Sequence, residues 1–244
     1  MSNHKAIILA AGRGSRMNEL TLNRPKCLLE VNGISLLNRQ ISALKRAGIE
    51  EIGVVTGYQH ELLEQRGLVT FHNADWSSTN MVASLCCAQE WLECNPCIVS
   101  YSDIFYQSEA VAQLLSCKSA LALTYDENWE SLWEQRFEDP LSDAETFCFD
   151  TYSNLVDIGQ KTSNIERIQG QYMGLFVIRP QGWKEAQAVI QSLPKVEFQR
   201  FYMTDLFQAI VDRGKEKVKV LPYSDVWGEV DSPSDLMLYQ AEQA

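Results

Sequence analysis

The stretch Lys5-Ala-Ile-Ile-Leu-Ala-Ala-Gly-Arg-Gly-Ser-Arg-Met17 shows how the chain is built. Its apolar residues 6–11 predict a buried strand, which stops at the glycine-rich residues 12–16. A strand that leads into such a turn presents backbone N–H groups that no side chain covers, and chains bind phosphate groups in this way. The two arginines of the turn add positive charge, and Lys26 follows on a segment from which it could reach the same anion. The stretch therefore predicts a phosphate site.

Two common phosphate-binding turns are excluded by their spacing. A mononucleotide P-loop needs Gly-x-x-x-x-Gly-Lys followed by Ser or Thr, and the sequence has no such run. A dinucleotide fingerprint needs Gly-x-Gly-x-x-Gly, and Met17 stands at the third glycine position. The remaining alternative is a tight turn that binds nothing. The two arginines and the following Pro25-Lys26 favour the phosphate site over that alternative.

The composition is that of an ordinary globular protein, with 244 residues of which 45% are hydrophobic and 22% are charged. The formal net charge of -11 and the lack of a basic stretch argue against a nucleic-acid partner, since such binding depends on clustered Lys and Arg. No signal peptide or membrane span is predicted, so we expect a cytoplasmic protein whose seven cysteines are thiols. Cys94 and Cys97 have Cys-x-x-Cys spacing, but no second pair completes a zinc site.

Strand and helix signals alternate along most of the chain. Such alternation predicts an α/β fold with a doubly wound, mostly parallel sheet, whose ligands bind beyond the carboxyl ends of its strands. The expected strands are residues 6–11, 52–56, 69–73, 97–101, 120–125 and 218–222, and the expected helices are residues 36–47, 60–65, 80–92, 107–116, 183–192 and 203–213.

Residues 126–170 interrupt this alternation. A short helix at 126–133 is followed by a loop, and a small accessory sheet is expected from residues 147–149, 156–158 and 172–178. No Pro-, Gly- or Ser-rich linker separates this part from the rest. We therefore expect a single domain over residues 1–244, in which residues 126–180 form an accessory segment that covers the crevice.

Isolated acids near strand ends are candidate metal ligands. Asp103 follows an apolar strand, and Glu229 and Asp231 alternate along a predicted strand, so that their side chains point to one face. Like charges on one face repel each other unless a cation lies between them, and Mg²⁺ prefers one or two carboxylates with phosphate and water as further ligands. The alternatives are helix N-caps, Asp103 for the helix at 107–116 and Asp231 for a helix that begins at Ser232-Pro233.

Further motifs lie along nearly the whole chain. They are Leu9-Ala-Ala-Gly-Arg-Gly-Ser-Arg-Met17, Arg24-Pro-Lys-Cys-Leu28, Thr56-Gly-Tyr58, Thr79-Asn-Met-Val-Ala-Ser-Leu85, Ser100-Tyr-Ser-Asp103, Phe137-Glu-Asp-Pro-Leu-Ser-Asp-Ala-Glu-Thr146, Gln171-Tyr-Met-Gly-Leu175 and Trp227-Gly-Glu-Val-Asp231. Together they resemble the sugar-phosphate nucleotidylyltransferase superfamily. Within it, they resemble the branch of bacterial cytidylyltransferases that includes the choline-phosphate, 2-aminoethylphosphonate and glutamine-phosphate enzymes.

The resemblance implies a role for each group of candidate residues. Arg16 and Lys26 would hold phosphates as catalytic residues, and Asp103, Asp231 and Glu229 would hold Mg²⁺. The residues implied to bind the nucleotide are Ala10, Ala11, Gly12, Arg13, Gly14, Gly57, Tyr58, Thr79, Asn80 and Ser84. The last three are also expected to cap and open the helix at 80–92, and the two roles are compatible.

The middle segment contains the candidate acceptor site. Trp129 and Trp133 share one helical face, Tyr172 belongs to the same segment, and several acids lie nearby in the sequence. Aromatic faces beside carboxylates are the components of an ammonium-binding cage. Arg136 is a candidate partner for an acceptor that also has a carboxylate. The alternative is that the two tryptophans only anchor the segment.

The sequence thus predicts a Mg²⁺-dependent enzyme that moves CMP from CTP to a small phosphorylated amine or amino alcohol similar to phosphocholine. Its expected partners are CTP and this acceptor, without nucleic acid or membrane, and the sequence leaves the oligomeric state open. One alternative is a sugar-1-phosphate uridylyl- or thymidylyltransferase, which the aromatic-rich middle segment disfavours. The other is a catalytically silent nucleotide sensor, which the presence of Lys26, Asp103 and Asp231 disfavours.

Overall fold

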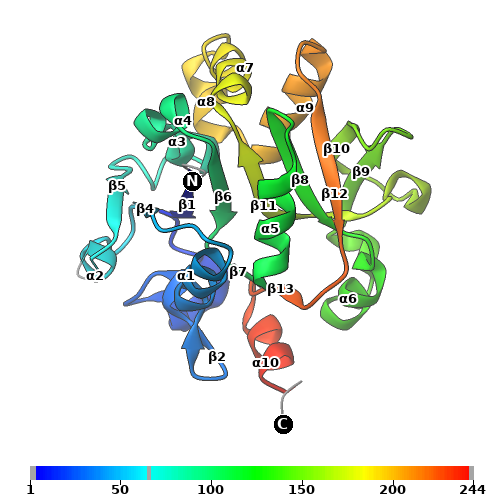
Figure 1. Cartoon of the computed structure of the whole chain (residues 1–244). Helices are drawn as coiled ribbons and strands as arrows, with labels where there is room; N and C mark the ends of the chain where they lie inside the picture. The colour runs from blue at the N-terminus through cyan, green and yellow to red at the C-terminus, as the bar shows by residue number, and fades with distance from the viewer. Residues whose placement is uncertain (1–3, 65–66, 242–244) are drawn as a thin grey trace.

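The computed structural model describes residues 4–64 and 67–241. Its central sheet has seven strands, in the spatial order β12 (Val218–Tyr223), β8 (Leu121–Asp126), β11 (Gln171–Ile178), β6 (Cys97–Tyr101), β1 (Lys5–Ala10), β4 (Ile52–Thr56) and β5 (Val69–His72) (Figure 1). Neighbouring strands are parallel except at β11, which is antiparallel to both β6 and β8. The prediction of a mostly parallel sheet is confirmed.

Helices cover both faces of the sheet, so the doubly wound arrangement is also confirmed. One face carries α1 (Leu36–Arg46) and α5 (Ser108–Ser116). The other face carries α3 (Met81–Cys86), α4 (Gln89–Cys94), α7 (Pro180–Ile190) and α9 (Met203–Arg213). None of the helices in the described part of the chain is long and apolar enough to cross a membrane.

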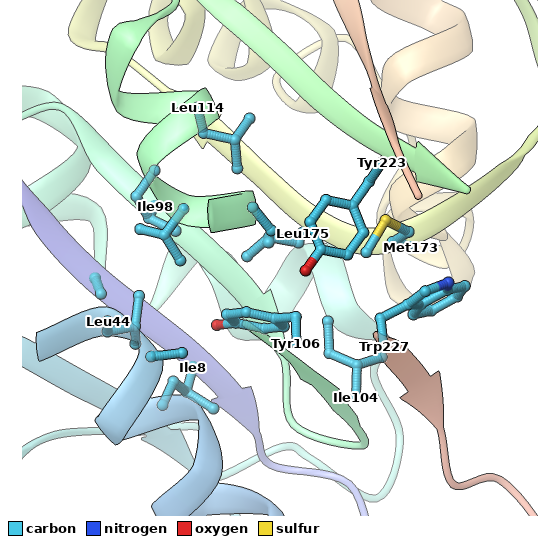
Figure 2. Close-up of a cluster of buried hydrophobic side chains, with 14 of the residues drawn as sticks. Ile8, Leu44, Ile98, Ile104, Tyr106, Leu114, Met173, Leu175, Tyr223 and Trp227 are labelled. Carbon is cyan, nitrogen blue, oxygen red and sulfur yellow. The ribbon is translucent and has the colours of Figure 1, made fainter. Parts of the chain in front are cut away.

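Alternate side chains of β1 explain why the sheet needs cover on both faces. Ile8 packs toward α1 and α5, where it joins Leu44 and Leu114 (Figure 2). Its neighbours Ile7 and Leu9 point to the opposite core, which α9 closes. Because successive residues of a strand face opposite sides, a continuous apolar run is buried only when both faces are covered.

The remaining elements surround the ends of the sheet. They are α2 (Glu61–Glu64), α6 (Trp129–Arg136), α8 (Lys195–Arg200), α10 (Pro233–Ala241), the 3₁₀ helices Ser15–Thr21, Lys26–Leu28, Pro140–Ser142 and Ile165–Arg167, and the antiparallel pairs β2 (Glu30–Val31) with β3 (Ile34–Ser35), β7 (Ile104–Tyr106) with β13 (Trp227–Glu229) and β9 (Glu145–Phe149) with β10 (Leu155–Lys161).

Two predictions about the elements were wrong. Residues 172–178, expected in the accessory sheet with β9 and β10, belong to β11 in the central sheet. Their continuous burial fits a central strand, because Leu175 faces one core and Phe176 the other. The helix expected at 80–92 is broken into α3 and α4, since Ala88 leaves the helical conformation with φ -97° and ψ 22°.

Smaller differences lie at element ends. The helix expected at 126–133 begins only at Trp129, because Asp126 still belongs to β8 and its carboxylate accepts hydrogen bonds from Asn128 N (2.8 Å) and Trp227 Nε1 (2.9 Å). The helix expected at 60–65 is observed as α2 up to Glu64, and residue 65 lies outside the described residues.

Candidate active site

The turn after β1 is shaped around a buried lysine. Gly14 has φ +68°, a conformation that favours glycine, and a Cβ atom there would lie 2.9 Å from Lys26 Cδ. Gly12 has no atom within 4 Å of such a Cβ, so the start of the turn is open. The second glycine therefore lets the Lys26 side chain pass close to the backbone, while the first leaves the N–H side of the turn uncovered.

Lys26 lies between two of the predicted metal carboxylates. Its Nζ is 2.9 Å from Asp103 Oδ2 and 2.5 Å from Asp231 Oδ1, although the two acids are far apart in the sequence. Burial of the ammonium lowers its pKa, but the charges of the two carboxylates outweigh burial, so the pKa of Lys26 is raised. Lys26 therefore carries a positive charge in the site. Arg16 also forms an ion pair with Asp231.

The short β7–β13 pair brings the acids together. Asp103 lies in the turn between β6 and β7, and Val230 N donates a hydrogen bond to its carbonyl oxygen (2.9 Å). One carboxylate oxygen from each of Asp103, Glu229 and Asp231 lies within 4.8 Å of the others. The sequence prediction that these three acids meet therefore agrees with the geometry. The register of β7 with β13, which sequence patterns did not reveal, is what aligns them.

The three clustered carboxylates are not fully satisfied by the cations around them, Lys26, Arg16 and Arg136. Burial raises the pKa of Glu229 to about 7, and the charges of Asp103 and Asp231 act in the same direction against the opposing effect of Arg136. Asp103 Oδ1 is also buried without a hydrogen-bond partner among the described residues. A divalent cation would favour the charged form of Glu229 and take the unpartnered Asp103 oxygen as a ligand, so the cluster fits a magnesium ion.

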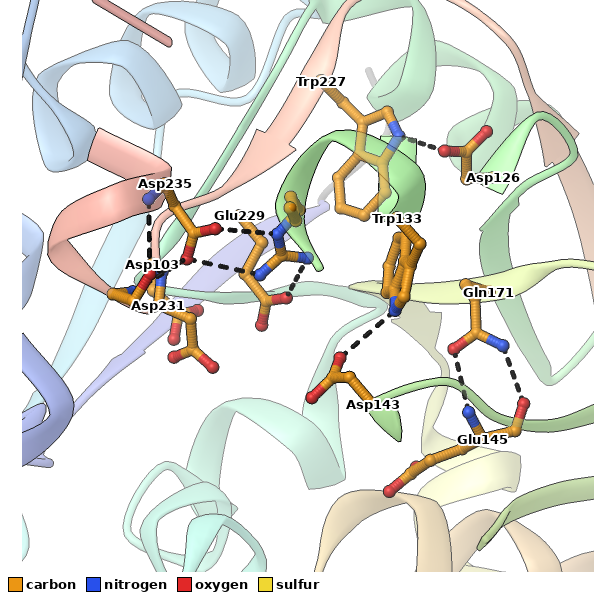
Figure 3. Close-up of polar contacts among 12 residues, drawn as sticks. Asp103, Asp126, Trp133, Asp143, Glu145, Gln171, Trp227, Glu229, Asp231 and Asp235 are labelled. Carbon is orange, nitrogen blue, oxygen red and sulfur yellow. Dashed lines mark hydrogen bonds and ion pairs between the residues drawn. The ribbon is translucent and has the colours of Figure 1, made fainter. Parts of the chain in front are cut away.

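Arg136 supports the cluster from behind. Its guanidinium is 1% exposed and donates to Glu229 Oε2 from Nη1 (3.1 Å) and to Asp235 Oδ1 from Nε (3.0 Å) (Figure 3). Asp235 also accepts hydrogen bonds at Oδ2 from the backbone N–H groups of Asp231 (2.9 Å) and Ser232 (2.8 Å). The expectation that Arg136 meets an acceptor carboxylate disagrees with this geometry, because its donors are directed at buried acids of the protein.

The predicted nucleotide-binding residues lie at the carboxyl ends of β1, β4 and β5. Tyr58 N donates to Ala11 O (2.9 Å), which joins the loop after β4 to the turn after Ala10. Asn73, at the end of β5, donates from its amide to Thr79 Oγ1 (3.1 Å) and Ser84 Oγ (3.0 Å).

The same loops have structural roles of their own. Asn80 caps α3 by accepting from Met81 N (2.8 Å), the capping role that local reasoning proposed. A Cβ atom at Gly57 would lie 2.6 Å from Ala11 O, so the two loops approach closely. The Arg13 guanidinium lies over the Tyr58 ring at 5.9 Å from its centre.

A cavity of about 360 Å³ adjoins the acidic cluster. Arg16, Glu229 and Asp231 line it together with two of the predicted acceptor residues, Trp133 and Tyr172. Trp129 does not line it, although both tryptophans pack in the same core and are 5% and 4% exposed. Trp133 donates from Nε1 to Asp143 Oδ2 (3.2 Å), so one tryptophan faces the cavity where two were expected (Figure 3).

Several lining residues were missed by sequence reasoning. They are Asp143, Glu145, Lys161, Tyr202, Thr204 and Asp205, which come from β9, β10, the start of α9 and the loops beside them. The motif that contains Asp143 and Glu145 was part of the resemblance, but no local pattern marked the segment at 202–205.

Comparison with known proteins identifies the family. Residues 6–179 match the family described as "MobA-like NTP transferase domain". The chain is 36% identical over 247 residues to the CTP:phosphoglutamine cytidylyltransferase of Campylobacter jejuni, a match that covers 95% of this chain and 97% of that protein. It is 36% identical over 103 residues to the choline-phosphate cytidylyltransferase of Haemophilus influenzae, which covers 41% of this chain and 43% of that protein.

A solved structure shows the same fold. The inositol-1-phosphate CTP transferase from T. maritima superimposes with a TM-score of 0.77 at 20% identity, covering 98% of this chain and 94% of that one. The family match spans the turn after β1, Lys26 and Asp103. The chain therefore belongs to the MobA-like NTP transferase family, and it is a nucleotidyltransferase, as its sequence predicts.

Proposed function

We propose that the chain is a cytidylyltransferase that moves CMP from CTP to a small phosphorylated acceptor with an amino group and releases pyrophosphate. The observation that carries the proposal is the position of Lys26 between Asp103 and Asp231, next to the open turn after β1 and beside a cavity large enough for a second substrate. The similarity to cytidylyltransferases over 95% of the chain supports CTP as the nucleotide.

Asp103 and Asp231 would hold Mg²⁺, with Glu229 as a third carboxylate. When bound, the ion supplies positive charge that neutralises the phosphates and helps to orient them. Lys26, held between Asp103 and Asp231, would bind a phosphate of the nucleotide with its ammonium. The unpartnered Asp103 oxygen and the raised pKa of Glu229 both support this assignment.

The chain's own residues act by binding and orientation. The transfer requires two polyanions to be held together. The attacking oxygen of the acceptor phosphate must lie opposite the pyrophosphate that leaves the α-phosphorus of the nucleotide. The N–H groups of the turn at Gly12 and Gly14 would bind the triphosphate, and Lys26 and Arg16 would stabilise the charge that grows on it as pyrophosphate leaves. Cations that the protein holds in place stabilise the transition state more than cations in water do, because they need not be reoriented as the charge develops.

We further propose that residues 1–244 work as one domain whose segment 126–180 provides most of the acceptor site. Trp133 and Tyr172 support this role, since both line the cavity. A cytoplasmic location is supported by the seven cysteines, all of which are free thiols in the structure.

The test is a pyrophosphate-release assay with each of the four common NTPs, Mg²⁺ and a panel of acceptors. The panel contains phosphocholine, phosphoethanolamine, 2-aminoethylphosphonate, phosphorylated glutamine and glucose 1-phosphate. The proposal predicts release from CTP with an amine-bearing acceptor. A preference for UTP or dTTP with glucose 1-phosphate would instead identify a sugar-phosphate enzyme and refute the proposal.

A further inference from the structure

The cavity has a second charged region, separate from the metal carboxylates. Asp143, Glu145 and Asp205 provide negative charge there, and Lys161 provides a positive charge. In Figure 3, Asp143 lies beside Trp133 and Glu145 beside Gln171, on the other side of Glu229 from Asp231. If the phosphate of the acceptor lies near Glu229 and Asp231, the opposite end of the acceptor molecule lies among the charged side chains of this second region.

Glu145 is held in place opposite Lys161 in the register of β9 with β10, but the two side chains form no ion pair. Gln171 fixes its backbone, with Nε2 donating to Glu145 O (2.7 Å) and Oε1 accepting from Glu145 N (3.3 Å). Its half-buried carboxylate forms no ion pair with a side chain of the described residues. Burial raises the pKa of this carboxyl, and the charges of Asp143 and Asp205 add to the effect, while Lys161 opposes it. An ammonium group is the ligand that such a carboxylate lacks.

Lys161 faces the same cavity and has no acidic partner. It ends β10, and its Nζ donates a hydrogen bond to the backbone oxygen of Asp143 (2.8 Å). No carboxylate of the described residues forms an ion pair with it. Close packing fixes the strand nearby, since a Cβ atom at Gly159, which has φ +82°, would lie 2.6 Å from Thr204 Cβ. Lys161 is therefore a positioned ammonium that remains available to an anion.

Arg136, the other cation near this region, is fully engaged by Glu229 and Asp235. The open groups of the cavity are thus one carboxylate and one ammonium.

We propose that the acceptor ends in an α-amino acid head group, with its ammonium bound by Glu145 and its carboxylate bound by Lys161. The inference rests on the proposed function and narrows its acceptor class. An α-amino acid has both charges on one carbon atom, so neighbouring acidic and basic side chains can bind it at two points. A choline head group has no anion and leaves Lys161 without a partner.

Matched acceptors test the role of Lys161. One pair is O-phosphoserine and phosphoethanolamine, and the other is glutamine phosphorylated on its side-chain amide and the same compound without its α-carboxylate. With CTP and Mg²⁺, the wild-type enzyme should have the higher kcat/KM for the carboxylate-bearing member of at least one pair. Lys161→Met should reduce that preference by up to about fivefold, as expected for one exposed charge pair. Lys184→Met, on the exposed face of α7, is the matched control and should retain the preference.

Glu145→Gln separates the two contacts, because it should lower kcat/KM for both members of a pair without changing their ratio. The inference is overturned if the wild-type enzyme prefers the decarboxylated members or reacts only with phosphocholine, or if Lys161→Met leaves the preference unchanged. In those cases the proposed function still stands. If no acceptor, phosphocholine included, releases pyrophosphate from CTP, the proposed function itself has failed.

Discussion

Replacing Asp235 with alanine should destabilise the protein strongly, although Asp235 lies behind the site and not in the cavity. The side chain is 4% exposed and pairs with Arg136, which is 1% exposed. The substitution leaves a buried guanidinium with Glu229 as its remaining partner at 3.1 Å, and removes the acceptor for the N–H groups of Asp231 and Ser232. Removal of one partner from a buried ion pair costs about 3–5 kcal/mol.

The remaining Glu229 contact places the expected loss at the lower end, about 3 kcal/mol. For a chain of this size that loss corresponds to a Tm lower by roughly 6–12 °C. The measurement is thermal and urea denaturation of both proteins. Asp157→Ala is the matched control, because Asp157 also pairs with an arginine, Arg167, but at the surface, where the pair is worth about 1 kcal/mol or less.

The pH dependence gives an internal check on the Asp235 prediction. Burial alone would raise the pKa of Asp235, but its hydrogen bond and ion pair with Arg136 outweigh burial and lower it. The stabilisation is therefore present above the ordinary pKa of 3.8 and is lost as the pH falls through the lower folded value. An Asp235→Ala protein as stable as the Asp157→Ala protein at neutral pH would refute the reasoning.

Three further predictions concern the site. Asp103→Asn should reduce kcat roughly 10²-fold or more without changing the circular dichroism spectrum, because the residue would ligate a metal and its partner Lys26 keeps the ion pair with Asp231. Unchanged turnover at saturating Mg²⁺ would remove Asp103 from the ligand set. Lys26→Arg should recover only part of the activity lost in Lys26→Ala, since a planar fork replaces a compact charge; full recovery in steady-state rates would contradict this role. Metal-free protein should lose stability as the pH rises from 4.5 to about 7, because folded Glu229, with its raised pKa, keeps its proton where the unfolded chain has released it. Urea denaturation in EDTA over this pH range should show that the free energy of unfolding falls less steeply with pH in Glu229→Gln than in the wild-type protein. An equally steep fall in both proteins would argue against the raised pKa of Glu229.

Local pattern was sufficient for the parallel part of the fold, but for the acids it left a metal site and helix N-caps open, and only the family resemblance favoured the metal site. The run at β1 must be covered on both faces, and an acid after a buried strand must lie at the sheet's carboxyl edge, so Asp103 could be placed without long-range information. Glu229 and Asp231 were placed by their alternation. What brings them to Asp103 is the β7–β13 pair, and a pair of three-residue strands leaves too weak a pattern to predict.

Tertiary partners decided the residues that were misjudged. Trp129 and Trp133 are equivalent on a helical face, and only the position of α6 against the core separates them. Arg136 was assigned to a ligand because its acidic partners lie about a hundred residues away in the sequence. Lys161 and Glu145 belong to a two-stranded sheet whose polar residues resemble ordinary surface residues until β10 is seen beside the cavity.

The central claim is that the Asp103–Asp231 site transfers CMP from CTP to a phosphorylated acceptor. Mass spectrometry of the product, together with pyrophosphate quantification, tests it directly with Mg²⁺, CTP and an amine-bearing acceptor. We expect a product heavier than the acceptor by one cytidylyl group and one pyrophosphate per product. Both should be lost in Asp231→Asn but not in Asp225→Asn, a change at an exposed acid. Release of inorganic phosphate and CDP without a coupled product, or full activity of Asp231→Asn, would contradict it.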